Sequence, residues 1–313
     1  MKFPKIPTHS LMRRLSPPKG KVPLVLDTDT YNEVDDQFAL AHAVLSPNEL
    51  DLQALYAAPF SNSRSGGPAD GMEKSFHEIH RILKLMGRGG DYPVFRGSES
   101  YLPAPDRPVE SPAARDLVER ARKHTATHPL YVLGIGAFTN LASAILMDPS
   151  IIKRIVVVIL GGQSFCHHSA HDFNLGQDIL ASRLLFDCGV PLVHIPCHPV
   201  TSHLTTTVHE AQHHLGGSNP LCDYLVDILR EYEKETVKKP RSGSAWSKVI
   251  WDIAATSWLI LPEAFRTETV HSPVLTDNCT WSFDRSRHPI AQVASLDRDR
   301  IFTDVFSKLA AMR

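Results

Sequence analysis

Four aspartates stand close together near the start of the chain, and side chains of this kind at this spacing could bind a cation. They are Asp27, Asp29, Asp35 and Asp36, and they follow the apolar run from Val22 to Leu26. Crowded carboxylates repel one another unless a positive charge lies among them, and oxygen donors without Cys or His favour a hard cation, Ca²⁺ or Mg²⁺. The alternative is that two of the acids end a strand and two cap a helix, all of them solvated. The turn alone leaves both interpretations open.

The segments on either side of this turn would hold the acids at the edge of a sheet. The run from Val22 to Leu26 is almost wholly apolar, which is typical of a strand buried on both faces of a parallel sheet. From about Asp36 the apolar positions recur at helical spacing, so Asp35 and Asp36 fall at a helix start, where the helix dipole favours carboxylates. We therefore expect a ligand site at the carboxyl end of this strand, as in open α/β sheets.

The composition is that of an ordinary globular protein and favours small-molecule chemistry. The chain has 313 residues, of which 42% are hydrophobic and 21% charged, and its 33 basic and 34 acidic residues nearly cancel. No excess of charge favours nucleic acid or a membrane surface, and the longest apolar runs are too short to span a bilayer. Residues 1–21 lack the apolar segment of a signal peptide, and the five cysteines are scattered without a CxxC. We expect a cytoplasmic protein with reduced thiols.

Beyond the acidic turn, short apolar runs alternate with amphipathic segments, as in βαβ units. We predict an α/β fold with an open, mostly parallel central sheet, helices on both faces, and one domain over residues 21–313. Residues 1–20, without periodicity, are interpreted as an N-terminal arm, and residues 205–248 as a small helical subdomain over the edge that carries the site. The predicted strands are Leu52–Ala57, Pro93–Phe95, Leu130–Ile135, Ile155–Leu160, Leu192–Ile195 and Ala291–Ser295, and the predicted helices include Ala113–Arg122, Thr139–Leu146, one capped by Asp178, Ile250–Leu259 and Arg300–Ala311.

Four segments, taken together, resemble the inosine–uridine-preferring nucleoside hydrolase superfamily from about Val22 to the C-terminus. They are the DTD...DD turn, IGAFTNLA at residues 135–142, HDFNLGQD at residues 171–178 and IWDIAA at residues 250–255. The resemblance implies that the chain hydrolyses the N-glycosidic bond of ribonucleosides, releasing base and ribose, with a Ca²⁺ at the carboxyl ends of the strands. It also implies a nucleoside as the partner molecule and a homodimer or homotetramer.

The resemblance assigns the metal site residue by residue. Asp29 would be both a calcium ligand and the general base, Asp36 a bidentate ligand and Asp252 a third carboxylate ligand. Ile135 would supply a backbone carbonyl, for which its side chain is immaterial. Asp27 would support these residues.

The resemblance also implies a set of sugar contacts. Asp35 and Asn174 match residues that hold ribose hydroxyls, and Asp172 matches a carboxylate that meets the 5′-hydroxyl; the alternative for Asn174 is an ordinary turn residue. General chemistry agrees, because carboxylates near the ribose stabilise an oxocarbenium-like transition state. A carboxylate beside a metal-bound water can also accept its proton at neutral pH.

The sequence departs from the family pattern in three places. Asn32 and Glu33 are inserted into the acidic turn and could change the ribose contacts. After the second strand, residues 58–60 (Ala-Pro-Phe) stand where the family usually has Gly-Asn, so the ribose-binding asparagine is either missing or replaced by Asn62. Trp251 occupies the position of a histidine that often precedes the last calcium-binding aspartate.

Trp251 in place of histidine resembles the purine-preferring subgroup, in which aromatic stacking replaces acid catalysis. We therefore predict that purine nucleosides are favoured and that Trp251 is catalytic; the alternative is that Trp251 only packs in the core. A second aromatic wall is sought among Tyr101, Phe60, Phe165 and Trp246. The histidines at 167, 168 and 171 are interpreted as solvated or substrate-facing rather than as a transition-metal site.

Two other functions compete with nucleoside hydrolysis. A Mg²⁺-dependent phosphohydrolase of the haloacid dehalogenase type also has a DxDxT motif after an apolar strand, although Tyr31 stands where that motif has threonine. The second alternative is a catalytically impaired nucleoside- or sugar-binding protein, which the missing histidine and the altered asparagine would explain.

Overall fold

An eight-stranded sheet forms the centre of the computed structural model, which describes residues 3–237 and 245–312. The strand order is β3-β2-β1-β4-β5-β6-β12-β9, and every neighbouring pair is parallel except β12 and β9. This arrangement confirms the predicted open, mostly parallel sheet. The strands are β1 (Val22–Thr28), β2 (Leu50–Ala57), β3 (Val94–Arg96), β4 (Leu130–Gly134), β5 (Ile155–Leu160), β6 (Leu192–Ile195), β9 (Phe265–His271) and β12 (Pro289–Leu296).

Strand β1 lies in the interior of the sheet, between β2 and β4, and it carries the first two aspartates of the acidic turn. Leu24 and Leu26 belong to the core on one face, while Val25 belongs to the core on the other face. Burial on both sides explains why the run has no polar alternation. Asp27 is the second-last residue of the strand, and Asp29 follows its end.

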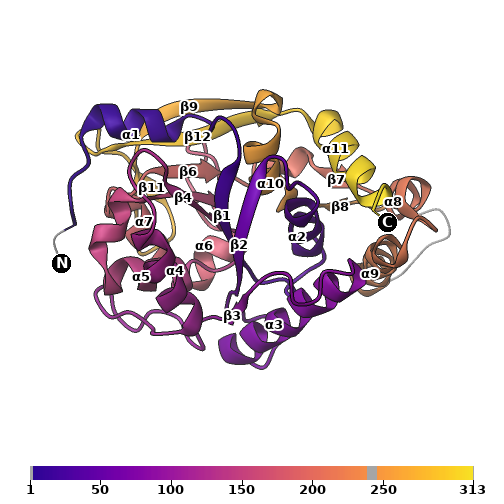
Figure 1. Cartoon of the computed structure of the whole chain (residues 1–313). Coiled ribbons are helices and arrows are strands. Elements are labelled where there is room, and N and C mark those ends of the chain that lie inside the picture. The colour runs from indigo at the N-terminus through magenta and orange to yellow at the C-terminus, as the bar shows by residue number, and fades with distance from the viewer. Residues whose placement is uncertain (1–2, 238–244, 313) are drawn as a thin grey trace.

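Helices cover both faces of the sheet, as predicted (Figure 1). On one face lie α2 (Asp36–Val44), α3 (Pro68–Leu85), α10 (Ile253–Ile260) and α11 (Arg298–Ala310), and on the other lie α4 (Pro112–Arg122), α5 (Thr139–Met147) and α7 (Ile179–Asp187). The helix α6 (Phe173–Gln177) and the 3₁₀ helices at Pro149–Lys153, Thr201–His203 and Pro262–Ala264 are shorter.

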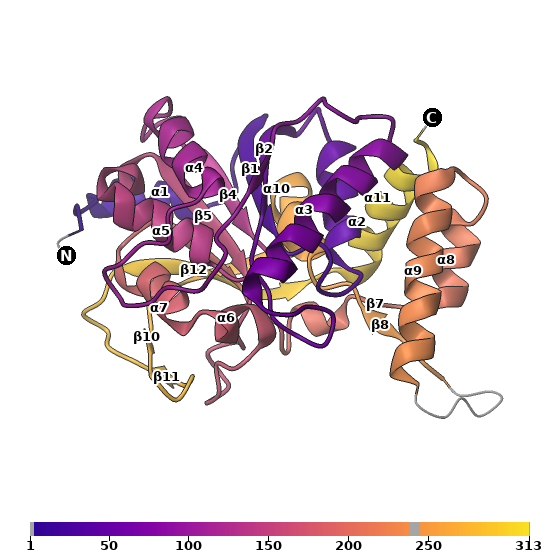
Figure 2. The ribbon, with the colours of Figure 1, turned by 90° about the horizontal axis from the view of Figure 1, so that it is seen from below.

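Helices α8 (Val208–Leu215) and α9 (Pro220–Thr236) lie side by side at one edge of the molecule, beyond α3 and α11 (Figure 2). The short strands β7 (Thr205–Thr206) and β8 (Lys248–Val249) pair beside them. This group coincides with the predicted helical subdomain, of which residues 238–244 lie outside the described residues. The apolar side chains of α8 and α9 join the same core as α2 and α10.

The structure corrects the prediction for the first twenty residues. Helix α1 (Thr8–Leu15) lies within the predicted arm and packs against β12, with Leu11 and Leu15 buried. The helix has only three apolar residues, Leu11, Met12 and Leu15, of which Met12 is exposed, and Pro, Lys and Arg surround them in the sequence. That is too little periodicity to identify it.

The C-terminal third also differs from the prediction. Strand β9 and the hairpin of β10 (Val274–Leu275) and β11 (Trp281–Ser282) were not predicted. The helix expected from residue 250 begins at Ile253, so Trp251 and Asp252 lie in the turn before it. Within residues 3–237 and 245–312, no helix combines the length and apolar character needed to cross a membrane.

Candidate active site

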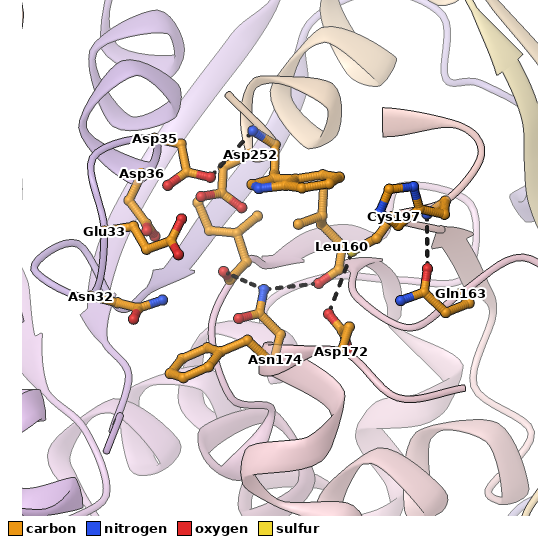
Figure 3. Close-up of a pocket in the computed structure, with 14 residues that line it drawn as sticks. Asn32, Glu33, Asp35, Asp36, Leu160, Gln163, Asp172, Asn174, Cys197 and Asp252 are labelled. Carbon is orange, nitrogen blue, oxygen red and sulfur yellow. Dashed lines mark hydrogen bonds between the residues drawn. The ribbon is translucent and has the colours of Figure 1, made fainter. Parts of the chain in front are cut away.

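A cavity of about 240 Å³ opens at the carboxyl ends of the parallel strands (Figure 3). Its walls come from the acidic turn, the ends of β4, β5 and β6, the start of α6 and the turn before α10. Seven of the ten predicted site residues line it, and Asp27, Asp29 and Asn62 do not. The lining residues are Asn32, Glu33, Asp35, Asp36, Ile135, Leu160, Gln163, Asp172, Phe173, Asn174, Cys197, His198, Trp251 and Asp252.

Three carboxylates meet in the cavity wall. Oxygen atoms of Asp35, Asp36 and Asp252 lie within 4.8 Å of one another, and all three residues are buried. Asp35 ends the turn before α2 and accepts a hydrogen bond from the backbone N–H of Trp251 at 3.2 Å. Asp36 is the first residue of α2 and accepts from the Thr28 hydroxyl at 2.5 Å. The starts of α2 and α10 therefore bring these acids together from distant parts of the sequence.

Asp29 completes the acidic group but is fully buried. Both of its carboxylate oxygens lack a hydrogen-bond partner among the described residues. Gly136 leaves space for it, because a Cβ atom there would lie 2.9 Å from Cγ of Asp29. Burying an ionised carboxylate without any partner reduces the stability of the fold by roughly several kcal/mol, unless a nearby positive charge compensates it.

The electrostatics of this group call for a cation. Burial raises the pKa of Asp29 well above the usual aspartate value, and the charges of Asp36 and Asp35 raise it further. Burial, followed by the same two charges, raises the pKa of Asp252 as well. The pKa of Asp36 is raised to about 7 by burial and the charge of Asp35. The donor set is entirely oxygen, so the residues present fit a hard divalent cation.

Two strand-end carbonyls hold Asn174 in place. Its Nδ2 donates to the carbonyl oxygens of Ile135 at 2.8 Å and Leu160 at 3.1 Å, and its Oδ1 points toward the cavity (Figure 3). Asn174 is therefore an anchored residue of α6 with a free acceptor, not a solvated turn residue. Asp172 caps α6 by accepting from the N–H of Leu175, and it also accepts from the Cys197 thiol at 3.5 Å.

The two inserted residues both reach the cavity. Nδ2 of Asn62 donates to Oδ1 of Asn32 at 2.6 Å, so Asn62 lies behind Asn32 and not in the cavity wall. This position corrects the prediction that Asn62 contacts the substrate directly. Glu33 accepts from the Tyr232 hydroxyl at 3.1 Å and pairs with Lys248, whose Nζ also lies 3.8 Å from Asp35. Residues of α9 and β8 thus fix the insertion.

Asp27 does not line the cavity and lies behind the acidic group. It is fully buried, and Nδ2 of Asn140 donates to its Oδ2 at 2.7 Å. Burial raises the pKa of Asp27 to about 8. Asn140 belongs to the segment at residues 135–142, so two of the recognised motifs meet here.

Trp251 lines the cavity as well as packing against the core. The His198 ring lies edge-on to it, with ring centroids 5.6 Å apart and an interplanar angle of 74°. His198 and Phe173 also line the cavity and were not predicted. Phe173 belongs to the recognised segment at residues 171–178, whereas nothing in the sequence around His198 distinguishes it from the other histidines.

The four aromatic residues predicted as a second wall do not line the cavity. Phe60 is fully buried, and Phe165 stacks on His194 at 5.0 Å. Tyr101 donates its hydroxyl to Gln177, and Trp246 packs against the main core. None of these four candidates therefore forms a second wall, because each ring packs against or bonds to residues elsewhere in the fold, and the sequence does not specify those contacts.

The chain matches known proteins over most of its length. Residues 24–303 match the family described as inosine-uridine preferring nucleoside hydrolase. The pyrimidine-specific ribonucleoside hydrolase RihA of Escherichia coli O9:H4 (strain HS) is 27% identical over 275 residues, which cover 79% of this chain and 82% of that protein.

Two solved structures share the fold. The plant nucleoside hydrolase PpNRh1 enzyme has a TM-score of 0.73 at 20% identity and covers 94% of this chain and 100% of its own. The purine-preferring ribonucleoside hydrolase from Gardnerella vaginalis has a TM-score of 0.74 at 19% identity and covers 93% of this chain and 98% of its own.

Proposed function

Because the chain belongs to the inosine-uridine preferring nucleoside hydrolase family, we propose that it hydrolyses ribonucleosides with a calcium ion and prefers purine nucleosides. Membership of this family makes it a ribonucleoside hydrolase. The calcium ion, the role of each residue and the preferred base constitute the proposal. Its main support is the group of four buried carboxylates, one of which has no partner among the described residues.

The ion would be held by Asp29, Asp36 and Asp252 together with the carbonyl oxygen of Ile135. That carbonyl already accepts from Asn174, and a carbonyl oxygen has a second lone pair for a cation. Asp35 lies in the same cluster, but Lys248 and the Trp251 N–H already hold its carboxylate. When bound, a calcium ion supplies positive charge that makes a water molecule easier to deprotonate.

The residues of the chain carry the remaining steps. Asp29 accepts the proton of the water that attacks C1′, since its oxygens are free of other donors. The surrounding carboxylates stabilise the positive charge that develops on the ribose ring. Asp35 and Oδ1 of Asn174 accept hydrogen bonds from ribose hydroxyls, and Asp172 accepts one from the 5′-hydroxyl.

The purine preference depends on Trp251. Relatives named for pyrimidine and for purine substrates both occur among the matches, so similarity alone does not decide the base. An indole face matches a purine in size, and stacking on aromatic side chains contributes ~1–3 kcal/mol per base in nucleic-acid complexes. Stacking that strengthens as the base departs lowers the barrier as well as KM.

A panel of nucleosides tests the proposal. Purified protein is incubated with inosine, guanosine, uridine and cytidine, and free base and free ribose are measured with Ca²⁺, after chelation, and after Ca²⁺ is restored. We expect inosine and guanosine to be cleaved faster than uridine, no turnover after chelation, and recovery with Ca²⁺. Full activity in a metal-free sample would contradict the calcium assignment, and a preference for uridine would contradict the purine assignment.

The same panel separates the two alternative functions when 4-nitrophenyl phosphate is added to it. Phosphate release without ribose release would indicate a phosphohydrolase. Binding of nucleosides without release of base or phosphate would indicate an impaired binding protein.

A further inference from the structure

The proposed function leaves the departing base without a proton donor. Cleavage of the bond between C1′ and nitrogen leaves an electron pair on the base, which is a poor leaving group unless a proton neutralises it. Trp251 stands where related sequences often have a histidine, and an indole N–H is too weak an acid for this step. Stacking on Trp251 lowers the barrier without supplying a proton, so a side chain of the cavity that can transfer a proton to the base would add to it.

His198 is placed to supply this proton. This residue follows the carboxyl end of β6, lines the cavity, and meets the ring of Trp251 edge-on at a centroid distance of 5.6 Å. If the base stacks on Trp251, as proposed above, the imidazole lies beside the same base. Among the described residues that line the cavity, His198 is the only one with an imidazole.

A short chain of hydrogen bonds fixes the backbone of His198. Its N–H donates to Oε1 of Gln163 at 2.9 Å, and Nε2 of Gln163 donates to the carbonyl of His171 at 2.8 Å. The indole N–H of Trp281 donates to the carbonyl of Gln163 at 3.1 Å. The side chain of His198 itself is exposed, so it can regain a proton from solvent after each turnover.

The thiol of Cys197 and the phenol of Tyr101 already donate their protons to other residues. The Cys197 thiol donates to Asp172, and burial raises the pKa of this thiol well above its ordinary value. The hydroxyl of Tyr101 donates to Gln177. Imidazole is also the side chain that exchanges a proton most readily near neutral pH.

We propose that His198 is the leaving-group acid of this hydrolase, an inference that depends on the proposed nucleoside hydrolase function. As the C1′–N bond breaks, its electron pair passes to the base, and the His198 imidazolium transfers one proton to that base. Water adds to C1′ and loses one proton to Asp29. The products are neutral base and ribose; solvent then returns a proton to His198 and accepts one from Asp29.

The test compares a leaving group that needs a proton with one that does not. His198→Gln is assayed with inosine and with 4-nitrophenyl β-D-ribofuranoside, whose nitrophenolate departs without protonation. We expect kcat for inosine to fall by ~10²–10⁴-fold, the usual contribution of an acid or base catalyst, while kcat for the nitrophenyl riboside stays within about threefold. His209→Gln is the matched control, since its side chain is exposed on α8 and does not line the cavity, and it should leave both rates unchanged.

Equal losses on both substrates would overturn the proposal, because His198 would then only shape the cavity; unchanged inosine turnover would overturn it as well. A wild-type protein that cleaves neither substrate would instead contradict the proposed function from which the inference starts. Circular dichroism and the melting temperature verify the fold, and His198→Asn provides the same comparison if the Gln variant is unstable.

Discussion

Two groups of residues face the same cavity but are built differently. The acidic cluster, Asp29, Asp35, Asp36 and Asp252, is buried and lies at the ends of β1 and the starts of α2 and α10. The aromatic pair, Trp251 and His198, is partly exposed and lies in two turns that follow or precede regular elements. Buried charges require a fixed geometry, whereas stacking on a flat ring tolerates several bases. We infer that the acidic cluster, which would act on the sugar, tolerates little change in its geometry. The aromatic pair, which would contact the base, can accept different bases.

Asp29→Asn gives the most severe test of the acidic cluster. We expect kcat to fall by at least ~10²–10⁴-fold for every nucleoside, since the variant loses its proton acceptor. Steady-state rates with inosine and with uridine measure the effect. Asp91→Asn removes an exposed carboxylate in the turn after α3 and should change neither rate. Near-normal turnover by the Asp29 variant would assign the general base to another residue.

Trp251→Ala is expected to have a smaller and selective effect. Loss of ~1–3 kcal/mol of stacking corresponds to roughly 5- to 150-fold in kcat for inosine and guanosine, with a smaller loss for uridine. Trp251→Phe, which keeps an aromatic face, should recover part of the purine rate. Equal losses for purine and pyrimidine nucleosides would show that Trp251 only packs in the protein. The proposed difference between the acidic cluster and the aromatic pair would then be wrong.

Glu33→Gln should produce the smallest change in kinetics. It tests whether a carboxylate beside the acidic cluster takes part in the reaction. Glu33 lines the cavity and pairs with Lys248, so its neutral counterpart loses about 1 kcal/mol of interaction, or roughly a fivefold rise in KM with little change in kcat. Glu235→Gln, which removes an exposed partner of Arg64, is the matched control. A large fall in kcat would indicate that Glu33 takes part in the reaction itself and does not only hold the cavity wall.

The part of the site that could be predicted from sequence is the part encoded locally. A buried run followed by helical periodicity placed Asp35 and Asp36 at the start of α2, and the cap of α7 by Asp178 was predicted for the same reason. Both depend on patterns a few residues long. The sheet and its helices followed from the repetition of such patterns along the chain.

The remaining features depend on contacts between distant segments. His198 reaches the cavity because β6, which it follows, pairs with β5. No local sequence pattern indicates that these two strands are neighbours. Asn62 was expected to face the substrate, yet Asn32 of the insertion lies in front of it. Strand β9 was missed because it is an edge strand with several exposed side chains, for which apolar alternation is weak.

The ion pair between Glu33 and Lys248 has a consequence for how the protein is made. The acidic turn is synthesised some two hundred residues before Tyr232, Lys248 and Asp252, which complete its surroundings. The turn cannot acquire its final geometry until Tyr232 and Lys248 have also emerged from the ribosome. A nascent or shortened chain that carries every residue of the turn but stops before Lys248 and Asp252 would therefore remain inactive.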